Sequence, residues 1–441
     1  MEEVVLNSGD TAWMLASTAL VLLMTPGLAF FYGGMVRTKS VLNMMMMSMV
    51  TIGIVSILWV IYGFELAFGY KSDSPWYGGI GLSNLGGQVN ELTNNGGVYP
   101  IPVLVFAAFQ LMFAIITPAL ISGAIADRAK FTSWAIFVAI WSTVVYFPVA
   151  HWVFAFGNKV GDTITSTGYL AGKGVQDFAG GTAVHINAGA AGLALAIVLG
   201  KRIGWRKESM RPHSLPLVML GSGLLWFGWF GFNAGSALSV GSLATVAFVA
   251  TMVSASAGGL TWAIVEWYLR GKPTAVGIAS GFLAGLVGVT PAAGFVTPVG
   301  AILIGSITAV CCFYAVSWRV KLEFDDSLDT YSVHGVGGTV GAILTGVFAT
   351  KSVNPAGFDG LLYGNPGQLI PQIVGVVATY IFAGAGTFVI IKILDSLMEL
   401  RVKPMVEEQG LDIDQHGEEA YGEDFASGLS FSTGSFSGKE R

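Results

Sequence analysis

The chain has 441 residues, of which 53% are hydrophobic and only 11% are charged. Soluble proteins carry about 25% charged residues, so this composition excludes an ordinary soluble enzyme, and the high hydrophobicity excludes a disordered chain. A net charge of −5 also argues against a nucleic-acid-binding protein. The outer surface of the protein is therefore expected to face lipid.

The charges are unevenly distributed along the chain. Residues 399–441 contain 10 acidic and 4 basic residues, whereas the preceding part contains 17 and 18. The sequence therefore predicts a membrane domain over residues 1–398 and an acidic tail over residues 399–441. The Ser/Gly-rich end of this tail, from Ser427 onward, is expected to be disordered.

A membrane-spanning helix needs about 20 mostly apolar residues. Eleven such stretches follow one another, at residues 11–35, 42–69, 101–124, 132–156, 178–200, 214–235, 243–269, 274–291, 298–319, 331–349 and 368–398. They predict an all-α integral membrane protein, because only helices and closed barrels satisfy the backbone in lipid and these runs are too long for barrel strands. The first run follows an acidic start and is interpreted as a retained helix; a cleaved signal is the alternative.

The basic loops predict the orientation. Lys and Arg residues follow the first, third, fifth, seventh and ninth stretches, so that every basic cluster lies on one side. The positive-inside rule makes that side cytoplasmic. The N-terminus is then expected outside and the C-terminus inside.

Two of the stretches share a pattern. Val184-His185 and Val333-His334 both begin the sequence V-H-x3-G-x2-G-x2-L-x2-V, and an acidic residue precedes each, Asp177 or Asp329, at different offsets. The first and sixth stretches also share F-x2-G. We therefore predict two five-helix halves plus an eleventh helix. The odd number of spans makes the repeats inverted, as in many transporters. Chance similarity between glycine-rich helices is the alternative.

The repeat singles out His185 and His334 among the histidines. Ionisable residues within a membrane are functional candidates, and two facing imidazoles can share a proton while lining an apolar path. His334 lies close to the start of its stretch. The equivalence therefore requires either that Asp325 to Thr330 dip inward or that this helix begin earlier.

Aromatic residues gather near the outward ends of two stretches. Phe109 and Phe113 lie on the third, and Trp229 and Phe232 lie on the sixth, which is followed by Ser236. Such rings could form a cup that attracts a small cation through its π faces. They could equally form the aromatic belt common at membrane interfaces. The sequence pattern leaves both interpretations open.

Several longer motifs resemble those of the Amt/Mep/Rh ammonium transporter superfamily, Amt branch. They are DFAGGTAVHIN at 177–187, TPGLAFFYGG at 25–34, GWFGFNAGS at 228–236, VGVTPA at 287–292, VHGV at 333–336 and HGEEAY at 416–421. The resemblance extends from about residue 10 to 424. It implies eleven helices in two inverted halves and a homotrimer with one pore per subunit.

The resemblance also implies roles for individual residues. By position, the twin pore histidines are His185 and His334, and the phenylalanine gate is Phe113 with Phe232. The outer recruitment site is assigned to Phe113, Phe154, Asp177 and Ser236, and the pore lining to Leu28, Phe31, Phe109 and Trp229.

Phe154 departs from the family pattern. The family usually has a tryptophan three residues after the histidine of the fourth helix, whereas here His151 is followed by Phe154. Phenylalanine has a weaker cation–π face than tryptophan. The departure therefore leaves the affinity of the outer site open, unless Trp152 or a residue of the long following loop replaces the missing ring.

The expected function is ammonium transport: the ion is recruited outside, loses its proton, and crosses as ammonia, with methylammonium as an analogue. An ammonium sensor and a neutral gas or water pore are the alternatives; the lack of an output domain after Arg401 disfavours the sensor. No enzyme activity, metal or cofactor is expected. The protein is expected in the plasma or inner membrane. Residues 1–398 would form the transport domain and 399–441 a regulatory tail that binds a PII-type protein.

Overall fold

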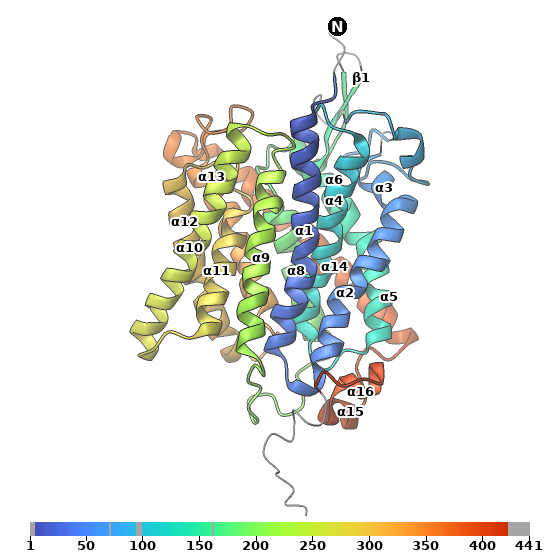
Figure 1. The fold of residues 1–441 in the computed structure, drawn as a ribbon, viewed down its shortest axis with the longest axis vertical. Helices are drawn as coiled ribbons and strands as arrows, with labels where there is room; N and C mark the ends of the chain where they lie inside the picture. Colours follow the sequence, from blue (N-terminus) through green and yellow to red (C-terminus); the bar gives the residue numbers. More distant parts are fainter. Residues whose placement is uncertain (1–4, 70–71, 94–98, 161–162, 422–441) are drawn as a thin grey trace, which may run out of the picture.

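In the computed structural model, which describes residues 5–69, 72–93, 99–160 and 163–421, the chain forms a bundle of long helices (Figure 1). Within these residues, nine helices are long and apolar enough to cross a membrane: Ser8–Met35, Thr38–Phe68, Val103–Ile125, Phe131–Phe154, Gly181–Leu199, Leu215–Gly235, Ser242–Arg270, Pro298–Lys321 and Pro366–Leu397. The two remaining predicted stretches are also helical but fall outside this set, the first because it has only 15 residues. They are α11 (Ala275–Val289), and the π-helix η7 (Tyr331–Gly335) continued by α13 (Val336–Phe348).

Several of the long spans contain one turn of π-helix. The second consists of η1 (Thr38–Ser40), α2 (Val41–Leu58), the π-helix η2 (Trp59–Gly63) and α3 (Phe64–Phe68). The third consists of α4 (Val103–Ile121) and η4 (Ser122–Ile125), and the fourth of α5 (Phe131–Trp141), the π-helix η5 (Ser142–Tyr146) and α6 (Phe147–Phe154). The fifth consists of the π-helix η6 (Gly181–Ile186) and α8 (Asn187–Leu199). Single π turns inside α-helices frequently mark functional positions.

The other long helices are α1 (Ser8–Met35), α9 (Leu215–Gly235), α10 (Ser242–Arg270), α12 (Pro298–Lys321) and α14 (Leu369–Leu397). Short polar residues cap several of their N-termini: the Asn7 side chain accepts a hydrogen bond from the Asp10 amide, and the Ser214 side chain accepts one from the Leu217 amide. Large apolar side chains such as Leu260 and Trp267 of α10 remain exposed, as expected for a lipid-facing surface.

The bundle has two distinct ends (Figure 1). At the hairpin end lie the start of α1 and the antiparallel hairpin of β1 (Phe156–Val160) and β2 (Thr163–Thr167). The connecting elements are η3 (Leu85–Gln88), α7 (Tyr169–Gly172), η8 (Leu361–Tyr363) and η9 (Pro366–Gln368). At the tail end lie the short helices α15 (Pro404–Gln409) and α16 (Leu411–His416). The predicted disorder from Ser427 onward falls outside the described residues.

The tail packs against the bundle through carboxylates. Asp412 accepts hydrogen bonds from the backbone amides of Leu42 and Asn43 at 3.0 and 2.8 Å, so that α16 is attached to the start of α2. Glu407 accepts one from the Ile203 amide at 2.7 Å and forms an ion pair with Arg401 at 2.8 Å. The described part of the predicted tail is therefore ordered against the membrane domain.

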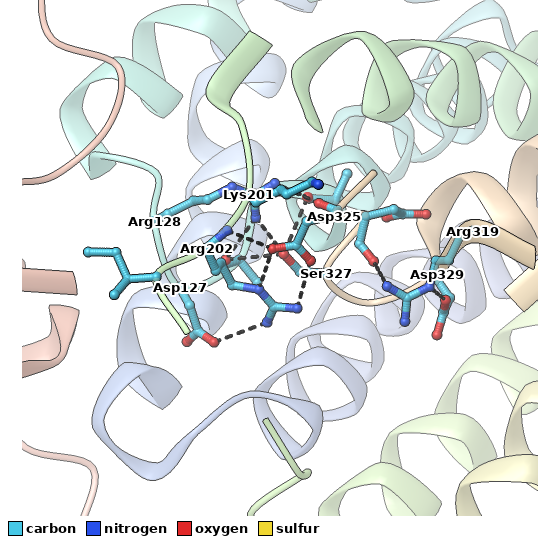
Figure 2. A network of polar contacts seen from close by, with 12 residues as sticks. Asp127, Arg128, Lys201, Arg202, Arg319, Asp325, Ser327 and Asp329 are labelled. Atoms are coloured by element: carbon cyan, nitrogen blue, oxygen red, sulfur yellow. Dashed lines mark hydrogen bonds and ion pairs between the residues drawn. The ribbon is translucent and has the colours of Figure 1, made fainter. Parts of the chain in front are cut away.

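Buried ion pairs join three loops at the tail end (Figure 2). Arg202 binds both Asp325 (2.9 Å) and Asp127 (3.3 Å), and Arg128 donates to the Ser327 hydroxyl at 2.6 Å. Burial alone would raise the pKa of Asp325, but the hydrogen bonds and charge of Arg202 hold it below the usual value. The network holds residues 325–330, of which all but Asp329 are buried, within the bundle. This is the inward dip that the equivalence of His185 and His334 required.

Candidate functional site

A carboxylate caps each of the two histidine-bearing π-helices. Asp177 accepts hydrogen bonds from the amides of Gly180, Gly181 and Thr182 at 2.7–2.8 Å, at the start of η6. Asp326 accepts bonds from the amides of Thr330 and Tyr331 at 3.0 and 2.7 Å, at the start of η7. Each carboxylate satisfies amides that would otherwise be unpaired at a helix start.

This geometry corrects one sequence assignment. Asp177 and Asp326 each lie eight positions before their histidine, so that the offsets are equal. Asp329, which the sequence analysis paired with Asp177, instead forms an ion pair with Arg319. The true equivalent was one turn earlier in the sequence. The similarity between the two segments therefore extends from the capping aspartate through the V-H-x3-G-x2-G-x2-L-x2-V motif.

Two glycines bring the histidine-bearing helices into contact. A Cβ atom on Gly189 would lie 2.4 Å from the Gly335 Cα, and one on Gly338 would lie 2.8 Å from the Gly181 carbonyl oxygen and 3.1 Å from the His185 Cβ. Gly189 follows His185 by four residues, and Gly338 follows His334 by four residues. Gly189 packs against the residue after His334, and Gly338 packs against His185. The crossing therefore brings the two histidine-bearing helices together through reciprocal contacts.

His185 and His334 meet at this crossing. Their Nδ1 atoms lie 3.2 Å apart, and the rings are nearly parallel at 16°, with centroids 5.3 Å apart. The Trp229 ring stacks on His185, with centroids 5.4 Å apart, and its indole nitrogen donates to the Thr290 hydroxyl at 2.9 Å. Within the described part of the chain, the His185 Nε2 atom is buried and has no hydrogen-bond partner. It is available to a small polar molecule.

The imidazole pair faces a cavity of about 10 Å³ whose lining carries no charged residue. That volume is close to the lower limit for holding one water molecule. The lining consists of Met24, Leu28, Phe31, Tyr32, Ile116, Leu120, Val184, His185, Leu225, Trp229, Phe232, Leu283 and His334. A second cavity of about 10 Å³ shares Phe31 and His334 with the first and extends toward Asp329. The pair therefore lies between two small, mainly apolar spaces.

Stacked phenylalanine rings separate the cavity of the pair from a third cavity. The rings of Phe113 and Phe232 are 4.1 Å apart at 24°; Phe232 lines the cavity of the pair, and Phe113 lines the third cavity. Phe109 packs edge-on against Phe113 at 5.0 Å but lines neither cavity. A molecule moving between the cavities would have to displace the stacked rings.

The third cavity, called the outer cavity below, has a volume of about 30 Å³. Its lining is Phe106, Gln110, Phe113, Phe154, Phe156, Phe178, Ser236 and Leu238. Phe113, Phe154 and Ser236 were assigned to the outer site from the sequence. Asp177, assigned to the same site, is absent from the lining and acts as the cap described above.

Sequence reasoning missed Gln110, Phe106, Phe156, Phe178 and Leu238. Gln110 is only 8% exposed, and its Oε1 atom has no hydrogen-bond partner among the described residues. A buried amide without a partner is unfavourable unless a ligand satisfies it. The signal that could have identified it is a lone amide in the apolar run 103–116. No group of three or more metal-binding side chains lies together in the described ranges.

Known proteins resemble this chain over almost its whole length. Residues 12–421 match the family model described as Ammonium Transporter Family. The chain belongs to this family. It is 48% identical over 439 residues to an ammonium transporter of Mycobacterium tuberculosis, covering 95% of this chain and 91% of that protein.

Two solved structures extend the similarity to the fold. The crystal structure of Saccharomyces cerevisiae Mep2 superposes with a TM-score of 0.80 at 33% identity, covering 90% of this chain and 88% of that chain. A structure titled Sensor Amt Protein gives a TM-score of 0.83 at 29% identity, covering 92% and 98%. The chain is thus an all-helical, multi-pass membrane protein of a transporter family.

Proposed function

We propose that this protein transports ammonium across a cell membrane, and that the three cavities form its path. The observation that carries the proposal is the buried His185–His334 pair in an uncharged cavity sized for one small molecule. A charged ion at the centre of a membrane costs several kcal/mol, whereas the neutral molecule avoids most of that penalty. The path therefore favours ammonia over any permanent cation.

In the proposed mechanism, ammonium collects in the outer cavity against the rings of Phe113 and Phe154. The oxygen atoms of Gln110 and Ser236 can accept its hydrogen bonds. Ammonium then gives up one proton, which either returns to the outside solution or follows the same path, and the ammonia that remains passes the gate of Phe113 and Phe232. It then donates to or accepts from the imidazole pair. The pair can also pass the released proton, which would make transport electrogenic. Potassium has no proton to lose and is excluded.

We further propose the architecture and setting of the transporter. All eleven apolar stretches would span the bilayer, with α11 as the shortest span. The hairpin end would face outside, and the tail end, which carries the basic loops, would face the cytoplasm. Residues 1–398 would form the transport domain of a homotrimer in the plasma or inner membrane. Residues 399–441 would form the regulatory tail, which a PII-type protein could engage. The protein would catalyse no covalent reaction.

The test is a flux assay in proteoliposomes with ammonium, methylammonium and potassium. We expect the wild type to carry ammonium and to exclude potassium. The double variant His185→Ala with His334→Ala should lose this selectivity, because a pore without the pair no longer favours the neutral molecule. His213→Ala, which removes an imidazole at the tail end, is the matched control. A double variant that kept full ammonium selectivity over potassium would disprove the mechanism.

An ammonium sensor is the second candidate, favoured by the similarity to the Sensor Amt Protein. The same liposomes separate the two functions. Robust ammonium-dependent currents support a transporter, whereas tight ammonium binding without current supports a sensor. Flux of water or a neutral gas that does not depend on ammonium would indicate a neutral-solute pore.

A further inference from the structure

The outer cavity lacks the tryptophan that the family usually places at position 154. We propose that Phe156, the first residue of the β1–β2 hairpin, supplies the missing aromatic wall and so sets the affinity of this site for ammonium. The inference rests on the proposed function. It adds a residue from outside the helical bundle to the recruitment site.

Trp152 is the obvious alternative, but its contacts exclude it. Its indole nitrogen donates to the Trp76 carbonyl oxygen at 3.1 Å, and its ring packs against Phe382 at 4.6 Å and against Tyr169 at 5.8 Å. It does not line the outer cavity. Its side chain is only 5% exposed and is held on the side of α6 that faces α14. The replacement for the tryptophan ring must therefore come from elsewhere.

Phe156 lines the outer cavity together with Phe154 and Phe113. Phe154 meets Phe113 edge-on, with centroids 6.3 Å apart, and forms the inner wall of the cavity. Phe156 follows two residues later, where α6 has ended and the chain has become a strand (Figure 1). Its side chain is 46% exposed, which makes it the most exposed aromatic ring in the lining. It is the ring that an incoming cation would meet first.

The base of the hairpin is fixed, so that Phe156 is held in place. Phe156 pairs with Thr167 across the hairpin, and the next amide, that of Gly168, donates to the Ala155 carbonyl oxygen at 2.8 Å. A Cβ atom at Gly168 would lie 2.0 Å from the His151 carbonyl oxygen, so only glycine allows this strand to rest on the end of α6. The ring therefore has a defined position relative to Phe154.

The chemistry of the cavity suits a cation that donates hydrogen bonds. The lining contains no carboxylate, so attraction depends on ring faces and neutral oxygen atoms. Ser236 donates its hydroxyl proton to the Phe232 carbonyl oxygen at 2.8 Å, which leaves its oxygen lone pairs free to accept. The unpartnered Gln110 Oε1 provides a second acceptor. With both acceptors deep in the cavity, a further ring at the mouth increases the attraction for the whole ion.

The first experiment measures the concentration of half-maximal uptake for methylammonium in proteoliposomes. Phe156→Leu keeps an apolar side chain but removes the π face, and we expect this concentration to rise about two- to fivefold, as for the loss of one exposed cation–π contact. Phe156→Tyr should match the wild type. Phe358→Leu, the same change at a ring of similar exposure that does not line the cavity, is the control. If Phe156→Leu behaves like Phe358→Leu, the proposal is wrong.

A second variant tests whether Phe156 replaces the absent tryptophan. Phe154→Trp introduced into the Phe156→Leu protein should restore wild-type affinity, because a larger ring returns to the inner wall. If the combined variant needs as high a methylammonium concentration for half-maximal uptake as Phe156→Leu alone, Phe156 does not replace the absent tryptophan. All these variants should keep the exclusion of potassium and the melting temperature of the wild type. If the wild type itself carried no ammonium, the proposed function would fail. That result differs from a Phe156→Leu protein whose concentration of half-maximal uptake equals that of the wild type, which would reject only the role of Phe156.

Discussion

Replacing Gly189 with alanine tests the crossing that holds the two histidines together. The added Cβ atom would lie 2.4 Å from the Gly335 Cα, whereas carbon atoms in contact lie about 3.5–4.0 Å apart. The helices α8 and η7 would have to separate by about 1 Å at this point. The two Nδ1 atoms, now 3.2 Å apart, would then lie beyond hydrogen-bonding distance. Overpacking of this kind costs about 1–3 kcal/mol of stability.

The assay combines thermal unfolding in detergent with ammonium uptake in proteoliposomes. Gly189→Ala should lower the melting temperature and remove most of the selective uptake. Gly384→Ala is the matched control, because a Cβ atom there meets nothing within 4 Å, and it should be neutral or slightly stabilising. If Gly189→Ala and Gly384→Ala show the same uptake and the same melting temperature, the reasoning is refuted.

Three further predictions concern the Asp326 cap, the tail and the Trp229 ring beside the histidine pair. Burial, together with the charge of Asp329, raises the pKa of Asp326 to about 6. The raised pKa means that the protonated Asp326 side chain stabilises the folded state. This stabilisation is complete below about pH 4 and is lost as the pH rises through 6. The melting temperature should therefore rise on acidification from pH 7 to 5 by more in the wild type than in Asp326→Asn; equal rises would contradict this. Asp412→Ala should speed tryptic cleavage after Arg401 severalfold, because α16 loses its two bonds to α2; an unchanged rate on gels would count against that attachment. Trp229→Phe should lower the free energy of unfolding by about 1 kcal/mol, because the hydrogen bond from the indole N–H to Thr290 is lost. Ammonium selectivity should persist, and its loss would contradict the expectation.

The sequence pattern predicted the helical class well, because lipid permits few alternatives to the helix. Nine of the eleven stretches became long apolar helices, 274–291 became the shorter helix α11, and 331–349 became η7 and α13, which together cover 331–348. The sequence did not reveal how the loop before η7 is buried. Ion pairs such as Arg202–Asp325 join residues more than 100 positions apart, which no local pattern reveals.

The candidate site was predictable to the extent that it repeats. The matched motifs identified His185 and His334, and the structure brings them together. Asp326 was missed because Asp329 lay nearer to the motif and no length of repeat was known in advance. Phe156 was missed for a different reason: its proposed role depends on how the β1–β2 hairpin is positioned at the end of α6, which is a tertiary property.

The Nδ1–Nδ1 contact has a consequence for the direction of the path. A single proton can occupy that bond, so that in the neutral pair one ring donates through Nδ1 and the other must carry its proton on Nε2. One outer nitrogen is then a donor and the opposite one an acceptor, which orients the pair along the path. Passage of one proton through the pair reverses this polarity. A second proton can follow in the same direction only after the two rings have returned to their first tautomers. The pair would therefore pass one proton at a time and would need a tautomer change between successive protons.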